Sequence, residues 1–257
     1  MNEIPALSTF LIVCPLVFLA GFVDSIGGGG GLISLPAYMF AGLPMHQVIA
    51  TNKLSAALGA TVTTVRFAKN GLIRLKIALP SVVFAAAGSY LGAKLSLSMD
   101  EKFMERLLIV VLPVSAFFVL NRNLFRDRKP EEADYGPRTC VIACISAFVV
   151  GIYDGLYGPG TGTFLIIAFT VFAHMDITHA NGQAKAINLA TNIASLTVFL
   201  RSGNVLVSLG LAAAVCNMLG NYLGSGLAMK NGARIVRPVI LIVLLLLLIR
   251  ILAEMFF

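Results

Sequence analysis

The sequence predicts an all-α, polytopic membrane protein. Of its 257 residues, 58% are hydrophobic and only 12% are charged, and the mean hydropathy is +0.90. Soluble domains carry about 25% charged residues, so this composition argues against a water-soluble fold. At ~20 residues per crossing, the chain is long enough for about eight to ten membrane segments. The net charge of +7 predicts basic cytoplasmic loops rather than a nucleic-acid partner.

Ten apolar segments can be drawn along the chain. Residues 1–7 contain no Lys or Arg, so we expect the first segment to be a membrane helix and not a signal peptide. The second and seventh segments are too short to cross ~30 Å of hydrocarbon, and each follows a glycine-rich breaker, which predicts two broken or re-entrant helices. The segments are roughly 8–26, 31–45, 47–68, 77–98, 103–121, 138–156, 162–174, 180–200, 204–229 and 235–255.

The two halves of the sequence repeat each other. Asp24 aligns with Asp154 at an offset of 130, and after a two-residue insertion Lys53 aligns with Lys185 at an offset of 132. The second offset then holds as far as Gly92, which aligns with Gly224. We therefore predict two homologous repeats of inverted topology. Their expected boundaries are a first transmembrane repeat over 1–122, a basic cytoplasmic linker over 123–137 and a second repeat over 138–257.

The distribution of basic residues favours one orientation. With five crossings per half, residues 69–76, 122–138 and 229–237 fall on one side and carry 11 of the 19 Lys and Arg residues. With four crossings per half, 229–237 moves to the other side and the charge difference becomes smaller. The positive-inside rule prefers the first arrangement, which places both termini outside.

Two lysines lie at membrane depth, where an unpaired charge is costly. Lys53 and Lys185 each sit about two turns inside a segment, among amide and hydroxyl side chains. One reading is that they bind a small oxyanion, because ammonium groups in a low dielectric attract one strongly. The other reading is that each pairs with Asp24 or Asp154. The predicted neighbours are Thr51, Asn52, Asn188 and Asn192. Arg66 and Lys94 lie near segment ends, and we expect them to reach the interface.

The two glycine clusters indicate a second element of an anion site. A glycine-rich turn that enters a helix exposes backbone N–H groups and the positive end of the helix dipole. Such helix ends bind anions, and broken helices in corresponding positions of two halves are typical of transporter sites. Tight helix packing is the alternative role of such glycines. The residues predicted to contact the anion are Gly28, Gly29, Gly30 and Gly31 in the first half and Gly158, Gly160, Thr161 and Gly162 in the second.

Asp24 and Asp154 precede the two breakers by a few residues. A carboxylate in a partly dry site can carry a proton, so proton coupling and a lysine ion pair are both open for them. The histidines and cysteines form no zinc-binding pattern, and the sequence predicts no metal and no cofactor.

Taken together and in order, these motifs resemble the sulfite exporter TauE/SafE family of membrane transporters. The resemblance implies an inner-membrane transporter of small anions, with sulfite, sulfonates and related organic acids as its usual substrates. The stretches that carry it are 24–36, Gly42, 50–54, 66–71 and 90–93 in the first half, and 157–162, 182–185, Asn188, Asn192 and 199–203 in the second.

We therefore expect a non-enzymatic secondary transporter that moves a small anion by alternating access of its two halves. A passive anion channel that uses the same lysines is the alternative. An enzyme is disfavoured because no serine or cysteine has a nearby embedded histidine. The expected partners are the anion, the lipid bilayer of a bacterial inner membrane, protons as a coupling ion and a second copy in a homodimer, with no nucleic acid.

Overall fold

The computed structural model describes residues 7–100 and 135–256, and within these ranges it contains helices and short connections but no strand. Every predicted segment in these ranges corresponds to one helix. The segment 103–121 and most of the linker 123–137 lie outside the described residues. The helices are α1 (Leu7–Gly27), α2 (Gly31–Phe40), α3 (Met45–Lys69), α4 (Leu75–Ser98), α6 (Pro137–Leu156), α7 (Thr161–Val171), α8 (Ile177–Arg201), α9 (Val207–Asn231) and α10 (Ala233–Phe256).

Two helix boundaries differ from the predicted ones for local reasons. Helix α2 ends before 45 because Gly42 turns the chain with a φ of +80° and Pro44 is extended. Helix α8 begins before 180 because the Asp176 side chain accepts hydrogen bonds from the Thr178 and His179 backbone N–H groups. Burial raises the pKa of Asp176, but hydrogen bonds from His179 and Tyr135 outweigh it and lower that pKa to about 2.

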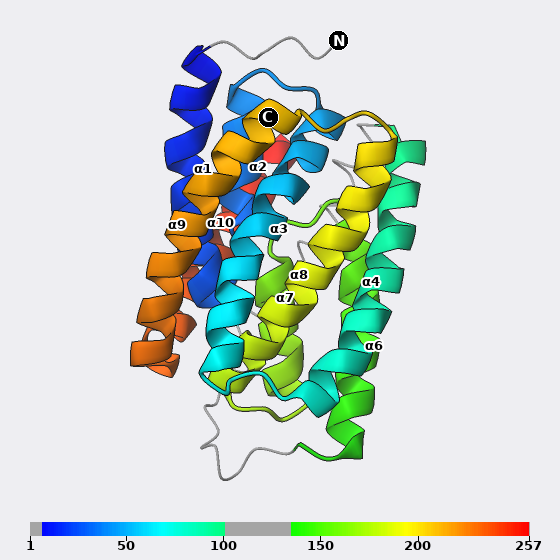
Figure 1. Cartoon of the computed structure of the whole chain (residues 1–257), viewed down its shortest axis with the longest axis vertical. Helices are drawn as coiled ribbons and strands as arrows, with labels where there is room; N and C mark the ends of the chain where they lie inside the picture. Colours follow the sequence, from blue (N-terminus) through cyan, green and yellow to red (C-terminus); the bar gives the residue numbers. More distant parts are fainter. Residues whose placement is uncertain (1–6, 101–134, 257) are drawn as a thin grey trace.

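The helix lengths recur in order. Helices α1 to α4 have 21, 10, 25 and 24 residues, and α6 to α9 have 20, 11, 25 and 25. Helices α3 and α8 lie at the centre of the bundle, with α1 and α9 packed together on one side and α4 and α6 on the other (Figure 1). Helix α10 lies behind α9 and contacts α1 and both short helices.

Corresponding helices run in opposite directions. In Figure 1, α3 descends from the end that holds the N-terminus, whereas α8 ascends toward it, and α4 and α9 are likewise opposed. The described connections 69–76 and 229–237, with their basic residues, therefore lie toward the lower end of the bundle, and 200–204 lies at the upper end.

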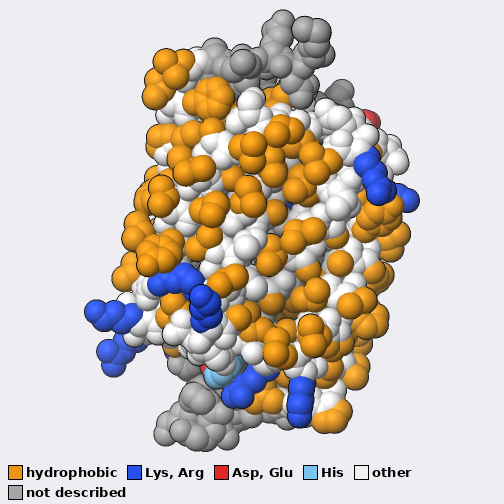
Figure 2. All heavy atoms as spheres, viewed as in Figure 1, with side chains coloured by type: hydrophobic (Ala, Val, Ile, Leu, Met, Phe, Trp, Pro, Cys, Tyr) orange, Lys and Arg blue, Asp and Glu red, His pale blue; other side chains and the backbone are white. Residues whose placement is uncertain are grey.

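The outer surface suits a lipid environment. Hydrophobic side chains cover the middle and upper part of the face in Figure 2, and Lys and Arg gather mostly toward its lower end. Four helices, α1, α4, α6 and α9, are long and apolar enough to cross a membrane. They present exposed apolar side chains such as Leu11, Val83, Ile145 and Val215. The polar helices α3 and α8 are shielded between them.

Glycines bring the outer helices into backbone contact. A Cβ atom added to Gly92 of α4 would lie 2.1 Å from the Ile152 carbonyl oxygen of α6, and one on Gly220 of α9 would lie 2.1 Å from the Phe18 carbonyl oxygen of α1. Small residues at spacings of four permit such close approach in membranes. These glycines therefore allow α4 to pack closely on α6, and α9 to pack closely on α1.

We predict that Gly92→Ala destabilises the protein, because the new methyl group meets backbone that has no rotamer to change. Overpacking of this kind costs about 1–3 kcal/mol, which corresponds to a fall in Tm of roughly 3–10 °C for a chain of this size. Thermal unfolding in detergent measures the change. Gly226→Ala is the control, since its Cβ would lie 3.3 Å from the flexible Arg66 side chain. An equal Tm for the two variants would contradict the prediction.

Candidate functional site

The two glycine turns meet in the interior of the bundle. Gly28, Gly29, Gly158 and Gly160 all have φ between +79° and +96°, a region that glycine enters without strain. A Cβ on Gly28 would lie 2.2 Å from the backbone nitrogen of Thr163. The turn between α1 and α2 therefore packs on the start of α7 with no room for a side chain.

The first buried lysine pairs with an aspartate of the other half. Lys53 is the ninth residue of α3, about 12 Å from the start of that helix at 1.5 Å per residue, and it is 2% exposed. Its Nζ lies 2.8 Å from Asp154 Oδ2 and donates to the Asp154 backbone oxygen at 2.6 Å. The other carboxylate oxygen of Asp154 accepts a hydrogen bond of 2.7 Å from the Thr161 hydroxyl.

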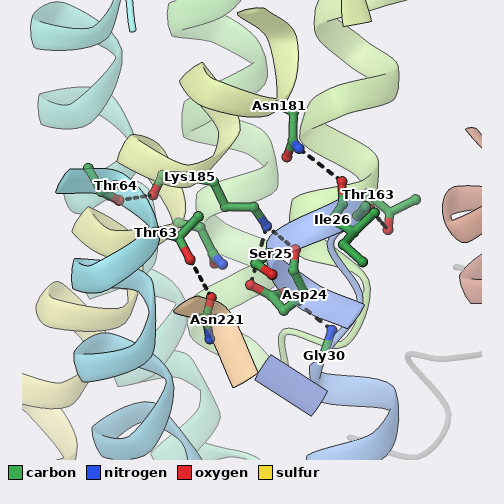
Figure 3. A network of polar contacts seen from close by, with 12 residues as sticks. Asp24, Ser25, Ile26, Gly30, Thr63, Thr64, Thr163, Asn181, Lys185 and Asn221 are labelled. Carbon is green, nitrogen blue, oxygen red and sulfur yellow. Dashed lines mark hydrogen bonds and ion pairs between the residues drawn. The ribbon is translucent and has the colours of Figure 1, made fainter. Parts of the chain in front are cut away.

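The second lysine makes the corresponding pair in the opposite direction. Lys185 is the ninth residue of α8, and its Nζ lies 3.2 Å from Asp24 Oδ2 and also donates to the Asp24 backbone oxygen. The remaining Asp24 oxygen accepts a 3.2 Å hydrogen bond from the Gly30 N–H group (Figure 3). Each lysine thus neutralises the aspartate that precedes the glycine turn of the other half.

Further hydrogen bonds attach the first glycine turn to the second half. The Thr163 hydroxyl donates to the Gly27 carbonyl oxygen at 2.8 Å, and the Asn181 amide donates to the Ile26 carbonyl oxygen at 2.9 Å (Figure 3). These bonds satisfy carbonyl groups at the end of α1 that have no partner within the helix.

A cavity of about 40 Å³ opens between the two turns. One water needs about 10–15 Å³ on this measure, so the cavity has room for a few water molecules or a small anion. Its wall contains both aspartates and Lys53, and most of the residues that the sequence predicted to contact an anion. Those predicted residues are Gly29, Gly30, Gly31, Asn52, Gly158, Gly160, Thr161, Gly162, Asn188 and Asn192.

Three predicted residues do not line this cavity. The Thr51 hydroxyl accepts a 3.1 Å hydrogen bond from the Leu206 N–H group and so serves the start of α9. Gly28 is covered by the start of α7. Lys185 is completely buried and lies behind Asp24, because its Nζ is engaged by the Asp24 carboxylate and carbonyl oxygens.

The cavity also has wall residues that the sequence analysis did not select, namely Ser34, Ala56, Tyr157 and Asn217. Asn217 is held from both ends, because its amide nitrogen donates to the Val17 carbonyl oxygen at 3.4 Å and its oxygen accepts from Asn221 at 2.7 Å. Two asparagines four residues apart in an otherwise apolar segment were the signal in the sequence that could have revealed it.

Both short helices begin at the cavity. The first residues of α2 and α7, Gly31 and Thr161, line it. The first turn of a helix carries a partial positive charge. Some of its backbone N–H groups are already engaged here, because Gly30 donates to the Asp24 carboxylate and Thr161 donates to the Gly158 carbonyl oxygen. The cavity therefore lies between two helix N-termini and is bordered by Lys53 and both aspartates.

The other embedded cations lie elsewhere. Arg66 donates to the Tyr222 backbone oxygen and to the Ser225 hydroxyl, and Lys94 lies 4.7 Å from the centre of the Tyr90 ring. Neither lines the cavity. The part of the chain that the structure describes contains no cluster of three or more His, Cys, Asp or Glu residues that could hold a metal ion.

We predict strong coupling between Lys53 and Asp154. Removing one partner of a buried pair leaves an uncompensated charge and lowers the free energy of unfolding by about 3–5 kcal/mol. Removing both partners leaves no buried charge. Asp154→Asn should therefore lower the Tm more than the double variant Lys53→Met/Asp154→Asn. Thermal unfolding of the wild type, both single variants and the double variant in detergent gives the cycle. A double variant that loses the sum of the two single losses would show that the pair is not coupled.

Comparisons with known proteins agree on one family. The family described as sulfite exporter TauE/SafE matches residues 13–251. The chain is 36% identical to the "Probable membrane transporter protein ORF9" of Sinorhizobium sp over 252 residues, which cover 96% of this chain and 93% of the relative. It is 33% identical to the "Probable membrane transporter protein YfcA" of Escherichia coli (strain K12), with 89% and 84% covered. No solved structure matches the chain.

The family match covers nearly the whole chain and includes both glycine turns and both lysines. The four apolar helices and the lipid-facing surface agree with a multi-pass integral membrane protein. The chain belongs to the sulfite exporter TauE/SafE family of membrane transporters.

Proposed function

We propose that this membrane transporter is a secondary transporter of a small anion, with sulfite, an organosulfonate or a related organic acid as its substrate. The observation that supports this most is the convergence of two helix N-termini and a buried lysine on one interior cavity. The ends of α2 and α7 supply backbone donors, Lys53 supplies charge, and Asn52, Asn188 and Asn192 orient the anion. The description of the family names sulfite, which agrees with this class of cargo.

The two ion pairs give the site a way to change state. Lys53 joins α3 to α6, and Lys185 joins α8 to α1, so both pairs link the halves. An anion that enters the cavity competes with Asp154 for the Lys53 ammonium group. Asp24 and Asp154 are the carboxylates through which we propose proton coupling, because each is held in an ion pair that the entering anion would loosen.

Alternating access follows if the halves are inverted repeats. The recurring helix lengths and the opposed directions of α3 and α8 support this arrangement (Figure 1). In such transporters one half rocks against the other around a site near the middle of the membrane. The first repeat would cover 1–122 and the second 138–257, joined by a basic cytoplasmic linker over 123–137. We place the protein in a bacterial inner membrane and propose that it forms a homodimer.

We predict that a small sulfur oxyanion stabilises the purified protein. A ligand that binds only the folded state adds about 2.7 kcal/mol at a hundredfold excess over Kd, which a thermal-shift panel detects. The panel contains sulfite, sulfate, taurine, sulfoacetate, short carboxylates and chloride. Lys53→Met should lose the shift, because this lysine lines the cavity. Lys94→Met is the matched control, because that lysine also lies on a membrane helix but outside the cavity, and it should keep the shift.

We also predict counterflow. Proteoliposomes loaded with unlabelled sulfite should transiently accumulate labelled sulfite above its external concentration, because a transporter exchanges one bound anion for another. The passive channel, which is the alternative function, lets the label equilibrate without any overshoot. Lys94→Met should retain counterflow, and Lys53→Met should abolish it. Equilibration without overshoot in the wild type would replace the transporter proposal with the channel.

A further inference from the structure

One acceptor on the cavity wall has no partner. The Asn52 side-chain oxygen is buried and makes no hydrogen bond within the described residues. It is the only such atom among the side chains that line the cavity in that part of the chain. A buried acceptor without a donor is costly, so this atom offers a binding contact to any ligand that brings a donor.

The other amides on the wall are already engaged. The Asn192 amide nitrogen donates to the Asn188 backbone oxygen at 2.7 Å and lies 3.2 Å from the Asn188 side-chain oxygen. Asn217 bonds at both ends to Asn221 and Val17. These contacts fix the orientation of Asn192 and Asn217, and among the described cavity-lining side chains the Asn52 oxygen is the buried polar atom that they leave without a partner.

The charges around the cavity nearly cancel. Asp24, Asp154, Lys53 and Lys185 form two ion pairs. The N-termini of α2 and α7 add partial positive charge, but α1 and α6 end at the same two turns and add partial negative charge. Because no large net charge selects the cargo, hydrogen bonds such as the one that Asn52 offers decide between anions.

We propose that the cargo is an anion that also carries an O–H or N–H donor, and that Asn52 accepts this donor. A protonated oxyanion such as hydrogensulfite has this character. The proposal rests on the proposed anion site and narrows its substrate class. Asn52 then determines specificity, while Lys53 and the two helix ends bind the negative oxygens.

Isosteric ligands test this directly. Hydrogensulfite and methanesulfinate have the same charge and nearly the same shape, but the second carries a methyl group in place of the hydroxyl group. Hydrogencarbonate and acetate form a second such pair. We expect the hydroxyl member of each pair to bind roughly tenfold tighter to the wild type, the ratio for one hydrogen bond to a buried acceptor. Titration calorimetry on the detergent-solubilised protein measures the sulfur pair in mildly acidic buffer, where sulfite carries one proton, and the carbon pair in mildly alkaline buffer, where hydrogencarbonate persists.

The variant Asn52→Leu should bring the ratio within each pair close to one, because it removes the acceptor and keeps a similar volume. The ratio compares two ligands on the same variant, so a general loss of stability does not mimic the effect. Asn231→Leu, on the exposed end of α9, should keep the wild-type ratio. Equal binding of both members by the wild type overturns the donor requirement while leaving the anion site intact. Binding of neither member would instead reject the proposed anion site.

Discussion

The two buried ion pairs are the interactions on which the rest of the structure depends. A lysine inside a membrane protein needs a counter-charge, and here each lysine finds it across the boundary between the halves. Each aspartate is in turn held by a group from its own glycine turn, the Gly30 N–H group or the Thr161 hydroxyl. The ion pairs therefore link the breaks in the helices to the contact between the halves. A change in one of these features changes the others.

The glycine turns make that arrangement possible. An aspartate at the end of one helix and a lysine in the middle of another can meet only if the chain reverses direction between α1 and α2, and between α6 and α7. Positive φ values at Gly28 and Gly158 produce the reversal, and the missing Cβ atoms let the two turns pack together. The same turns place the N-termini of α2 and α7 at the cavity. In a water-soluble protein, turns of this kind would usually lie exposed on the surface.

Much of this could be predicted from the sequence, because the signals are local. Hydrophobic runs predicted the helices, and glycine clusters predicted the breaks at Gly28–Gly31 and Gly158–Gly162. The crossed pairing of Lys53 with Asp154 could not be predicted, since neither spacing nor periodicity relates residues that are 101 positions apart. The orientation of the Thr51 side chain could not be predicted from the sequence either. It lies beside Lys53 in sequence, but on a helix its side chain points elsewhere and bonds to Leu206.

The site combines a symmetric charged frame, formed by the two lysine–aspartate pairs, with a polar wall of asparagines that is not symmetric between the halves. At an offset of 132, Lys53 corresponds to Lys185, but Asn52, Asn188, Asn192 and Asn217 correspond to alanines at 184, 56, 60 and 85. Asn188 and Asn192 follow Lys185 along α8, toward the end of the bundle that holds the N-terminus (Figure 1). If the halves exchange conformations, the charged frame presents the same contacts in both states, whereas the amides stay on one side. In the proposed alternating-access cycle, an anion would then have amide contacts in one state and alanine contacts in the other, so the two states would differ in their affinity for it.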